Sequence, residues 1–290
     1  MKVIDLYRKG APVLSLEIFP PRKDYPVETV FTTIEKLTRL QPGFIGVTYG
    51  AGGSNRDRTV EIAARIKRDY QVEALAHLTC VRHTRQEIAE ILDELQREGI
   101  HNIMALRGDI PEDEDDFQLE KQEYRYAYQL INDVRQRADF GILAAAHPEG
   151  HPECRRLHED LDNLKRKVDC GVDLLVTQLF FDNRIYCDFV DRAITKGIDC
   201  PIVPGIMPVL NVKQIKRMVY LCGASIPPKM LSLLDRYENN PADMEKAGIE
   251  YASEQVRDLL EDHVDGVHLY TMNKPEQITQ IVDNVGLRRL

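Results

Sequence analysis

The sequence lacks several features that would assign it to a specialised class of protein. Its six cysteines form no C-x-x-C pair, which argues against a zinc site or disulfide framework and favours reduced thiols. Nowhere do about 18 uncharged apolar residues occur together, and the N-terminal stretch contains no apolar run long enough for a signal peptide. The net charge of -9 leaves no basic excess for a nucleic-acid backbone. We therefore expect a cytoplasmic protein that binds neither nucleic acid nor membrane.

Motifs for nucleotide or metal binding are also missing or incomplete. The glycine-rich segment at 50–58, "GAGGSNRDR", could cradle a phosphate but lacks the G-x-G-x-x-G and Walker spacings. The prolines in "HPEGHPE" at 147–153 exclude the helical H-E-x-x-H geometry, so we expect no metal. The acidic run at 112–116, "EDEDD", is typical of a solvated loop and is a candidate lid. No linker divides the chain, so residues 1–290 are expected to form one domain.

Short β-branched runs alternate with longer amphipathic segments along the whole chain. This alternation is typical of βα units around a parallel sheet, and continuous apolar strands suit a sheet covered on both faces. Eight units in a chain of this length predict a (β/α)8 barrel, with an open doubly wound sheet as the alternative. The predicted strands are Val13–Phe19, Phe44–Tyr49, Val72–Leu78, Asn102–Arg107, Phe140–Ala146, Asp173–Leu179, Pro201–Ile206 and Gly266–Thr271.

Capping residues mark some of the predicted helices. Thr84 and Glu87 form a capping box before an amphipathic run that ends at Gly99, and Asn211 with Gln214 resembles a second such cap. The segment Ala224–His263 is longer than a barrel connection requires. It predicts extra helices inserted before the eighth strand.

Polar residues lie at the C-terminal end of nearly every predicted strand, where barrel enzymes build their active sites. Each residue alone is more simply a cap or a solvated rim group. Taken together, they would converge on one mouth, which predicts a binding pocket. They are Glu17, Thr48, Tyr49, His77, Thr79, Arg107, Asp109, His147, Glu149, His151, Gln178 and Tyr270.

Two of these carboxylates are expected to play different roles. Glu17 lies within an apolar strand, so desolvation should raise its pKa, which suits a general acid. The alternative is a structural ion pair with a neighbouring strand. Asp109 follows Arg107 and Gly108, and the guanidinium should hold it ionised for electrostatic work on a cation or a cofactor edge.

At these positions the sequence resembles the methylenetetrahydrofolate reductases, whose fold is a (β/α)8 barrel. The matching segments are "SLEIFPPR" at 15–22, "VTYGAGGSNRDRT" at 47–59, "HLTC" at 77–80, "ALRGD" at 105–109, "HPEGHPE" at 147–153, "NLKRKVDCG" at 163–171, "TQLFFD" at 177–182 and "PGIMPVLN" at 204–211. The resemblance covers the catalytic domain. It implies bound FAD that is reduced by NADH or NADPH and then reduces 5,10-methylenetetrahydrofolate to 5-methyltetrahydrofolate, in a ping-pong scheme.

The resemblance also implies roles for single residues. Glu17 matches the general acid that protonates the folate N10, and Asp109 matches the aspartate near the flavin pyrimidine edge. Gln178 matches a folate-contacting glutamine. The matched FAD-contacting positions are Thr48, His77, Arg107, Gly108, Asp109, His147, His151, Asp160, Asn163 and Lys167, with Lys167 as the phosphate partner.

Two positions depart from the family pattern. His147 stands where some relatives have tyrosine, and Val212 stands where some have an aromatic ring on which a nucleotide or folate could stack. The second departure leaves open an alternative in which a partner subunit supplies the electrons. A flavin-free barrel lyase would share the fold. We also expect a homo-oligomer, and no inhibition by S-adenosylmethionine, because the regulatory domain of the eukaryotic enzymes has no counterpart here.

Overall fold

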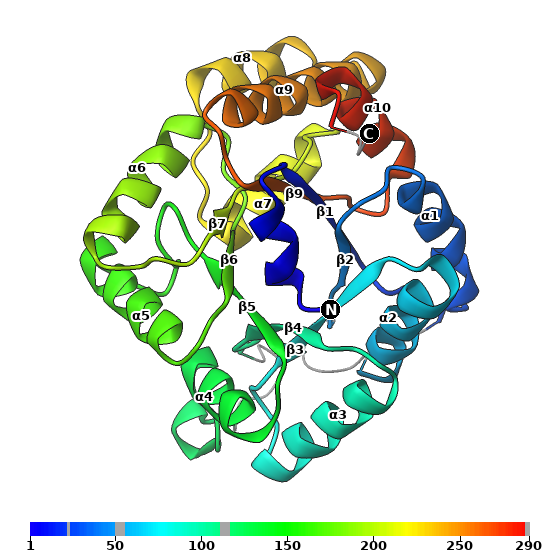
Figure 1. The fold of residues 1–290 in the computed structure, drawn as a ribbon. Helices are drawn as coiled ribbons and strands as arrows, with labels where there is room; N and C mark the ends of the chain where they lie inside the picture. Colours follow the sequence, from blue (N-terminus) through cyan, green and yellow to red (C-terminus); the bar gives the residue numbers. More distant parts are fainter. Residues whose placement is uncertain (22–23, 50–55, 111–116, 288–290) are drawn as a thin grey trace.

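The computed structural model describes residues 1–21, 24–49, 56–110 and 117–287. The segments at 50–55 and 112–116, which the sequence predicts as a phosphate cradle and a lid, lie outside the described residues. Parallel strands form the centre of the molecule, and helices surround them as a ring (Figure 1). The strands are β1 (Val13–Ile18), β2 (Phe44–Val47), β3 (Glu73–Thr79), β4 (Asn102–Leu106), β5 (Gly141–Ala146), β6 (Leu174–Thr177), β7 (Ile202–Val203), β8 (Gly205–Ile206) and β9 (Gly266–Tyr270).

The sheet closes into a barrel through the predicted seventh strand. β7 pairs with β6, and β8 pairs with β9, which in turn pairs with β1. The prediction of one continuous strand over Pro201–Ile206 is wrong, because Pro204 separates β7 from β8. Proline has no N–H to donate to a ladder, and here only its carbonyl takes part, accepting from His268 N at 2.9 Å. The (β/α)8 barrel is confirmed, and the open sheet is excluded.

The helices follow the predicted alternation. They are α1 (Glu28–Thr38), α2 (Arg56–Tyr70), α3 (Arg85–Arg97), α4 (Ala127–Arg137), α5 (Leu157–Asp169), α6 (Asn183–Thr195), α7 (Val212–Cys222), α8 (Pro228–Arg236), α9 (Pro241–Glu261) and α10 (Pro275–Val285), with short 3-10 helices η1 (Val3–Lys9) and η3 (Leu119–Lys121). The capping box of Thr84 and Glu87 is present. Asn211 accepts from Gln214 N at 2.8 Å, but the Gln214 amide oxygen accepts from Leu210 N, so the second cap is only half of a box.

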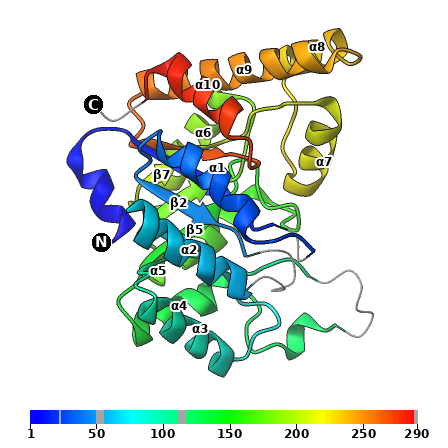
Figure 2. The same cartoon turned by 90° about the vertical axis from the view of Figure 1, so that its right-hand side faces the viewer.

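The predicted insertion consists of α8 and α9. α9 packs against α6 and α10 and so completes the helical ring, while α7 lies toward the C-terminal ends of the strands (Figures 1 and 2). η1 lies at the opposite end (Figure 2). Its Val3 and Leu6 are buried against one residue from each of several strands, including Phe44, Leu75 and Met104. The barrel interior is therefore filled from its N-terminal end by apolar packing. Among the described residues, no helix is long and apolar enough to cross a membrane.

A close backbone contact at Gly248 fixes α9 beneath the loop that leads to α7. A Cβ at Gly248 would lie 1.8 Å from Val209 O. Helix propensity alone predicts that Gly248→Ala stabilises the protein by about 1 kcal/mol. Because the clash is with backbone, we expect instead a loss of about 1–3 kcal/mol or more in the free energy of unfolding, measured by urea titration.

Ala247→Gly on the same helix is the matched control, and it should cost only about 0.5–1 kcal/mol through propensity. An increase in the stability of Gly248→Ala would show that α9 does not rest on the Val209 backbone as described.

Candidate active site

The C-terminal half of the barrel interior is polar, in contrast to the apolar half beneath it. Along β1, alternate residues share one face, so Ser15 and Glu17 point inward above Val13. His77 from β3, Thr177 from β6 and His268 from β9 are buried in the same region. Side chains from four strands therefore meet at the predicted mouth.

Glu17 lies between two histidines. Its Oε2 is 3.3 Å from His77 Nε2 and 3.6 Å from His268 Nε2, and the residue is only 7% exposed. Tyr270 is its register partner on β9, and the Tyr270 hydroxyl donates to Thr177 O at 2.7 Å. The carboxylate is thus buried but has hydrogen-bonding rings on two sides.

The electrostatic environment of Glu17 differs from the prediction. Burial raises the pKa of Glu17, but its interaction with the ionisable rings of His77 and His268 outweighs burial, so the net pKa lies below the usual value. The prediction of a raised pKa is wrong because it considered desolvation and not the histidines that come from distant strands. Burial, in turn, lowers the pKa of His77, against the opposing effect of Glu17. Without bound cofactor or substrate, the Glu17 side chain is therefore ionised at neutral pH.

Arg107 interacts with two carboxylates in different ways. Its NH1 and NH2 each donate to Glu153 at 2.6 Å, forming a two-pronged ion pair with the β5–α5 connection. Asp109 is exposed and interacts with Arg107 through charge, without a hydrogen bond between their side chains. The guanidinium fork itself binds Glu153, a partner that the sequence did not predict.

Gly108 allows the chain to turn between Arg107 and Asp109. Its φ is +89°, and a Cβ there would lie 2.8 Å from Val81 and 3.0 Å from Thr79. Thr79 Oγ1 is buried without a hydrogen-bond partner in the described part of the chain. The Gly108 backbone therefore packs closely on the Thr79 and Val81 side chains where β3 and β4 end.

A second group of predicted residues gathers where β5 meets α5. The rings of His147 and His151 lie 4.8 Å apart, edge to face. Lys167 donates to Ala145 O at 2.6 Å, and burial lowers its pKa to about 8, with Asp160 opposing the shift. Burial, followed by the charges of Lys167 and His151, lowers the pKa of His147 to about 3. The histidines are therefore neutral at neutral pH, and the positive charges near them are the Lys167 ammonium and the Arg107 guanidinium, which binds Glu153.

The other members of this group are less enclosed. Burial lowers the pKa of His151 and raises that of Asp160. Asn163 is exposed on α5, and its spacing places it on the same helical face as Asp160 and Lys167. The structure thus places Asn163 on the correct face but does not bring it into contact with the others.

Thr48 and Gln178 lie at the ends of their strands as predicted. Thr48 N donates to Ile18 O at 3.1 Å, and Thr48 O accepts from Thr59 Oγ1 at 2.9 Å. Gln178 N donates to Ala146 O at 2.7 Å. Both residues are half-buried, so their side chains are partly accessible. No group of three His, Cys, Asp or Glu side chains within the described ranges is placed to hold a metal.

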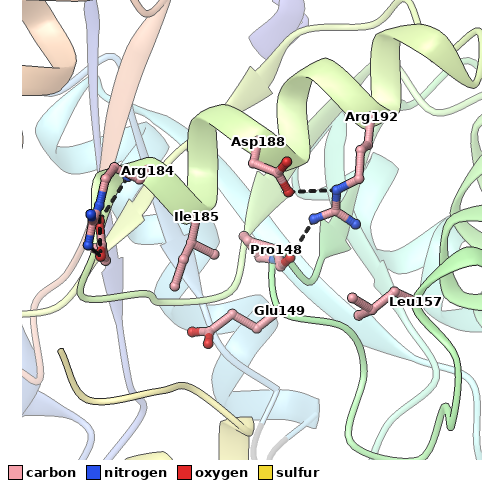
Figure 3. A pocket seen from close by; sticks show the side chains of 8 residues that line it. Pro148, Glu149, Leu157, Arg184, Ile185, Asp188 and Arg192 are labelled. Carbon is pink, nitrogen blue, oxygen red and sulfur yellow. Dashed lines mark hydrogen bonds and ion pairs between the residues drawn. The ribbon is translucent and has the colours of Figure 1, made fainter.

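Two clefts lie away from this interior. One, of about 540 Å³, lies between the β5–α5 connection and α6, where Arg192 donates to Asp188 and to Pro148 O (Figure 3). The other, of about 730 Å³, is lined by the end of α6 and the residues that precede β7 and β9. Neither cleft contains the predicted catalytic residues Glu17 and Asp109, so the buried polar cluster is the better candidate site.

Ser15 and His268 were not predicted as site residues, and Glu153 was considered only as a metal ligand that the prolines argue against. Ser15 and His268 lie two residues before the predicted Glu17 and Tyr270, on the inward faces of β1 and β9. The alternation in "VHLY" placed His268 on the same face as Tyr270 and could have revealed it. No local signal indicated that Glu153 would pair with Arg107, because 46 residues separate them.

The chain is similar in sequence to proteins of one family. A family model described as methylenetetrahydrofolate reductase matches residues 2–286. The chain is 38% identical over 280 residues to the 5,10-methylenetetrahydrofolate reductases of Escherichia coli and of Pectobacterium carotovorum, covering 97% of this chain and 93% and 92% of theirs. It is 37% identical to methylenetetrahydrofolate reductase (NADH) 1 of Arabidopsis thaliana, over 99% of this chain but only 51% of that protein.

Among solved structures, a Clostridium thermocellum protein described as binding two copies of 5-methyl-5,6,7,8-tetrahydrofolic acid matches with a TM-score of 0.64. It is 14% identical and covers 97% of this chain and 96% of its own, so it supports the fold alone. The chain spans about half the length of the plant relative and nearly all of the bacterial ones. By the family model and by these relatives, the chain belongs to the methylenetetrahydrofolate reductase family of oxidoreductases.

Proposed function

We propose that this protein reduces 5,10-methylenetetrahydrofolate to 5-methyltetrahydrofolate, using FAD and NADH or NADPH in two successive half-reactions. The observation that carries the proposal is the buried Glu17 carboxylate beside His77 and His268, at the mouth of a barrel of this family. Bacterial relatives that cover nearly the same length bear the name of this activity. The test is an anaerobic assay of NADH or NADPH oxidation with and without the methylene folate. The proposal fails if the folate does not accelerate oxidation.

The residues at the mouth fit a flavin with a phosphate-bearing tail. Lys167 offers a positive charge that has only a carbonyl and the more distant Asp160 to balance it. Thr79 offers a hydroxyl that, among the residues the structure describes, has no hydrogen-bond partner, and the Gly108 backbone leaves no room for a side chain. Both features suit the flat polar edge of a flavin ring. Bound FAD would supply a group that accepts hydride from the nicotinamide and passes it to the folate. The residues that we expect to hold it are Thr48, His77, Arg107, Gly108, Asp109, His147, His151, Asp160, Asn163 and Lys167.

Glu17 would serve the folate half-reaction by delivering a proton to N10 as the five-membered ring opens. A general acid must carry a proton at the moment of transfer, yet the unloaded Glu17 is ionised at neutral pH. The two adjacent histidines provide nitrogen atoms that can hold a proton close to the carboxylate. Gln178 would contact the folate from the end of β6. Glu17 and Gln178 lie at or near the C-terminal ends of β1 and β6, which is why we expect one substrate to contact both.

A partner subunit that delivers electrons is the second candidate. Val212, at the start of α7, is half-buried against an apolar cluster that includes Leu179, Met207 and Ile215, and it offers no aromatic surface to a nicotinamide. Under this alternative the flavin would stay oxidised at millimolar NADH and NADPH.

The cytoplasmic location and the formation of a homo-oligomer are still predictions. Size-exclusion chromatography with light scattering tests whether the protein self-associates.

Asp109→Asn separates the two half-reactions. A carboxylate near the flavin opposes the gain of negative charge on reduction, and an exposed one contributes about 1 kcal/mol, or about 20 mV for a two-electron couple. We expect the substitution to raise the midpoint potential by about that amount and to slow folate reduction, because a developing cation loses its stabilising charge. Potentiometric titration measures the first effect.

Asp109→Glu retains the charge and is the control, with an unchanged potential. A potential that stays the same or falls in Asp109→Asn would mean that this side chain does not lie beside the flavin ring.

A further inference from the structure

Ser15 and His268 form a second buried polar pair behind Glu17. Ser15 Oγ lies 2.9 Å from His268 Nδ1, and neither residue has any exposed surface. The other ring nitrogen, Nε2, faces Glu17 Oε2 at 3.6 Å. The imidazole therefore bridges a hydroxyl and the carboxylate at the mouth.

Packing holds this ring in place. Phe44 stacks on one side with ring centroids 6.2 Å apart, and Tyr270 meets it edge-on at 5.1 Å. Because His268 is fully buried, it can influence a substrate only through Glu17 or Tyr270. It is a positioning residue and not one that touches the reacting atoms.

The direction of the hydrogen bond between Ser15 and His268 determines whether a proton lies between His268 Nε2 and the Glu17 carboxylate. When the Ser15 hydroxyl donates to Val267 O, at 3.3 Å, Ser15 Oγ accepts from His268 Nδ1–H, and this is the ring tautomer that we assign. A neutral ring then presents the lone pair of Nε2 to the Glu17 carboxylate, so that two acceptors face each other. Consistent with this, neither His268 Nε2 nor His77 Nε2 has a hydrogen-bond partner within the described residues. The arrangement is satisfied only when a proton lies between the carboxylate and the ring.

We propose that Ser15 and His268 hold a proton jointly with Glu17 and so keep it ready for transfer to a substrate nitrogen. This inference rests on the proposed function. In the loaded state the proton is on Glu17 Oε2 or on His268 Nε2, and the Nδ1–H bond to Ser15 stabilises the ring in both cases. During transfer the bond between the proton and the pair breaks and the substrate N–H bond forms. A solvent proton entering from the mouth then reloads the pair.

Other titratable groups face this unit from three elements. His77 of β3 approaches Glu17, and burial lowers its pKa, so it is neutral at neutral pH. Tyr270 of β9 also faces Glu17, and burial raises its pKa. The Tyr7 phenol of η1 lies near Ser15, and burial raises its pKa as well. These neighbours are neutral around pH 7, so they add no charge beside Glu17 and His268.

Ser15→Ala tests the proposal by removing the acceptor for Nδ1–H. The neutral ring should then place its proton on Nε2, toward Glu17, and the charged ring should lose a hydrogen bond of about 1–1.5 kcal/mol, equivalent to about one pH unit. We expect folate reduction by the reduced flavin to slow about tenfold at pH 7. Its dependence on pH should move about one unit toward acid, while flavin reduction by NADH is unchanged.

Ser253→Ala is the matched control, because Ser253 is a fully buried serine on α9 that donates to Ile249 O. It should lower stability without moving the pH profile. If Ser15→Ala does not fold, His268→Gln replaces it, and the acid-dependent limb of the folate half-reaction should be lost. An unshifted profile in Ser15→Ala, or an intact limb in His268→Gln, overturns the proposal.

A readout independent of activity uses the FAD-free protein. Long-range nitrogen-15 NMR of the histidine rings, assigned with His268→Gln, reports which nitrogen carries the hydrogen. We expect Nδ1–H in the wild type and Nε2–H in Ser15→Ala; Nε2–H in the wild type contradicts the proposal. If the wild type does not reduce the folate but shows Nδ1–H, the proposed function fails while the proton-holding pair stands.

Discussion

Glu17→Gln is expected to abolish folate reduction while leaving FAD binding and flavin reduction by NADH or NADPH nearly intact. The amide keeps the size of the side chain but cannot deliver a proton, and only the folate half-reaction requires proton transfer to nitrogen. General acid catalysis contributes about 10²–10⁴-fold, so the rate at which the folate reoxidises the reduced flavin should fall by at least that factor. Anaerobic stopped-flow spectroscopy of the two half-reactions measures both effects in one preparation.

Glu73→Gln is the matched control for this substitution. The Glu73 side chain is also 9% exposed, but it lies at the N-terminal end of the barrel, where it accepts from Lys67 at 2.9 Å and from Asn102 at 3.1 Å. We expect Glu73→Gln to be less stable than the wild type but to reduce the folate at the wild-type rate per bound flavin. If Glu17→Gln slows flavin reduction as much as folate reduction, the role assigned to Glu17 is wrong.

Lys167→Met is expected to weaken FAD binding by about 10–150-fold, with no loss of stability in the FAD-free protein. A hydrogen bond to a charged group contributes about 1.5–3 kcal/mol, and the Lys167 ammonium donates only to a carbonyl, whereas the Arg107 guanidinium is already paired with Glu153. Methionine fills a similar volume and removes the cost of a buried charge. Isothermal titration of the FAD-free protein with FAD gives the affinity, and thermal unfolding gives the stability.

The lowered pKa of Lys167 adds a dependence on pH. Because burial lowers it from 10.5 to about 8, the folded protein releases this proton before the unfolded chain does. The contribution of Lys167 to stability should therefore rise between about pH 8 and pH 10.5 in the FAD-free protein. FAD affinity should fall above about pH 8, since the phosphates need the charged form. In Lys167→Met we expect both effects to be absent: the rise in stability between about pH 8 and pH 10.5, and the fall in FAD affinity above about pH 8.

Lys165→Met is the control, because Lys165 lies on the same helix but pairs with Asp169 on the outer surface. It should bind FAD as the wild type does. Unchanged FAD affinity in Lys167→Met would mean that the phosphates lie elsewhere.

Local sequence patterns predicted the barrel well because each βα unit carries its own signals. Apolar runs identified the strands, and the capping box at Thr84 marked a helix start that the structure retains. The same reasoning failed at Pro204, where one missing N–H divides a strand whose apolar pattern is continuous. The composition of a segment was enough to predict that it contains a strand. Whether that strand is continuous depended on a single backbone N–H group.

The electrostatics of the site could not be predicted in the same way, because they depend on side chains brought together by closure of the barrel. Glu17 and His268 are 251 residues apart in the chain, yet they are neighbours since β1 pairs with β9. Arg107 likewise finds Glu153 across a connection that no periodicity describes. Sequence reasoning therefore identified most of the candidate residues but did not predict that Glu17 lies beside histidines or that Arg107 binds Glu153.

The most direct test of the proposed function is a double-mixing stopped-flow experiment on the purified protein under anaerobic conditions. The first mixing adds NADH, and the second adds 5,10-methylenetetrahydrofolate, while the visible absorbance of the flavin is followed. We expect the absorbance to disappear after the first mixing and to return after the second, with 5-methyltetrahydrofolate as the product. A flavin that is reduced by NADH but stays reduced in the presence of the folate would contradict the proposal.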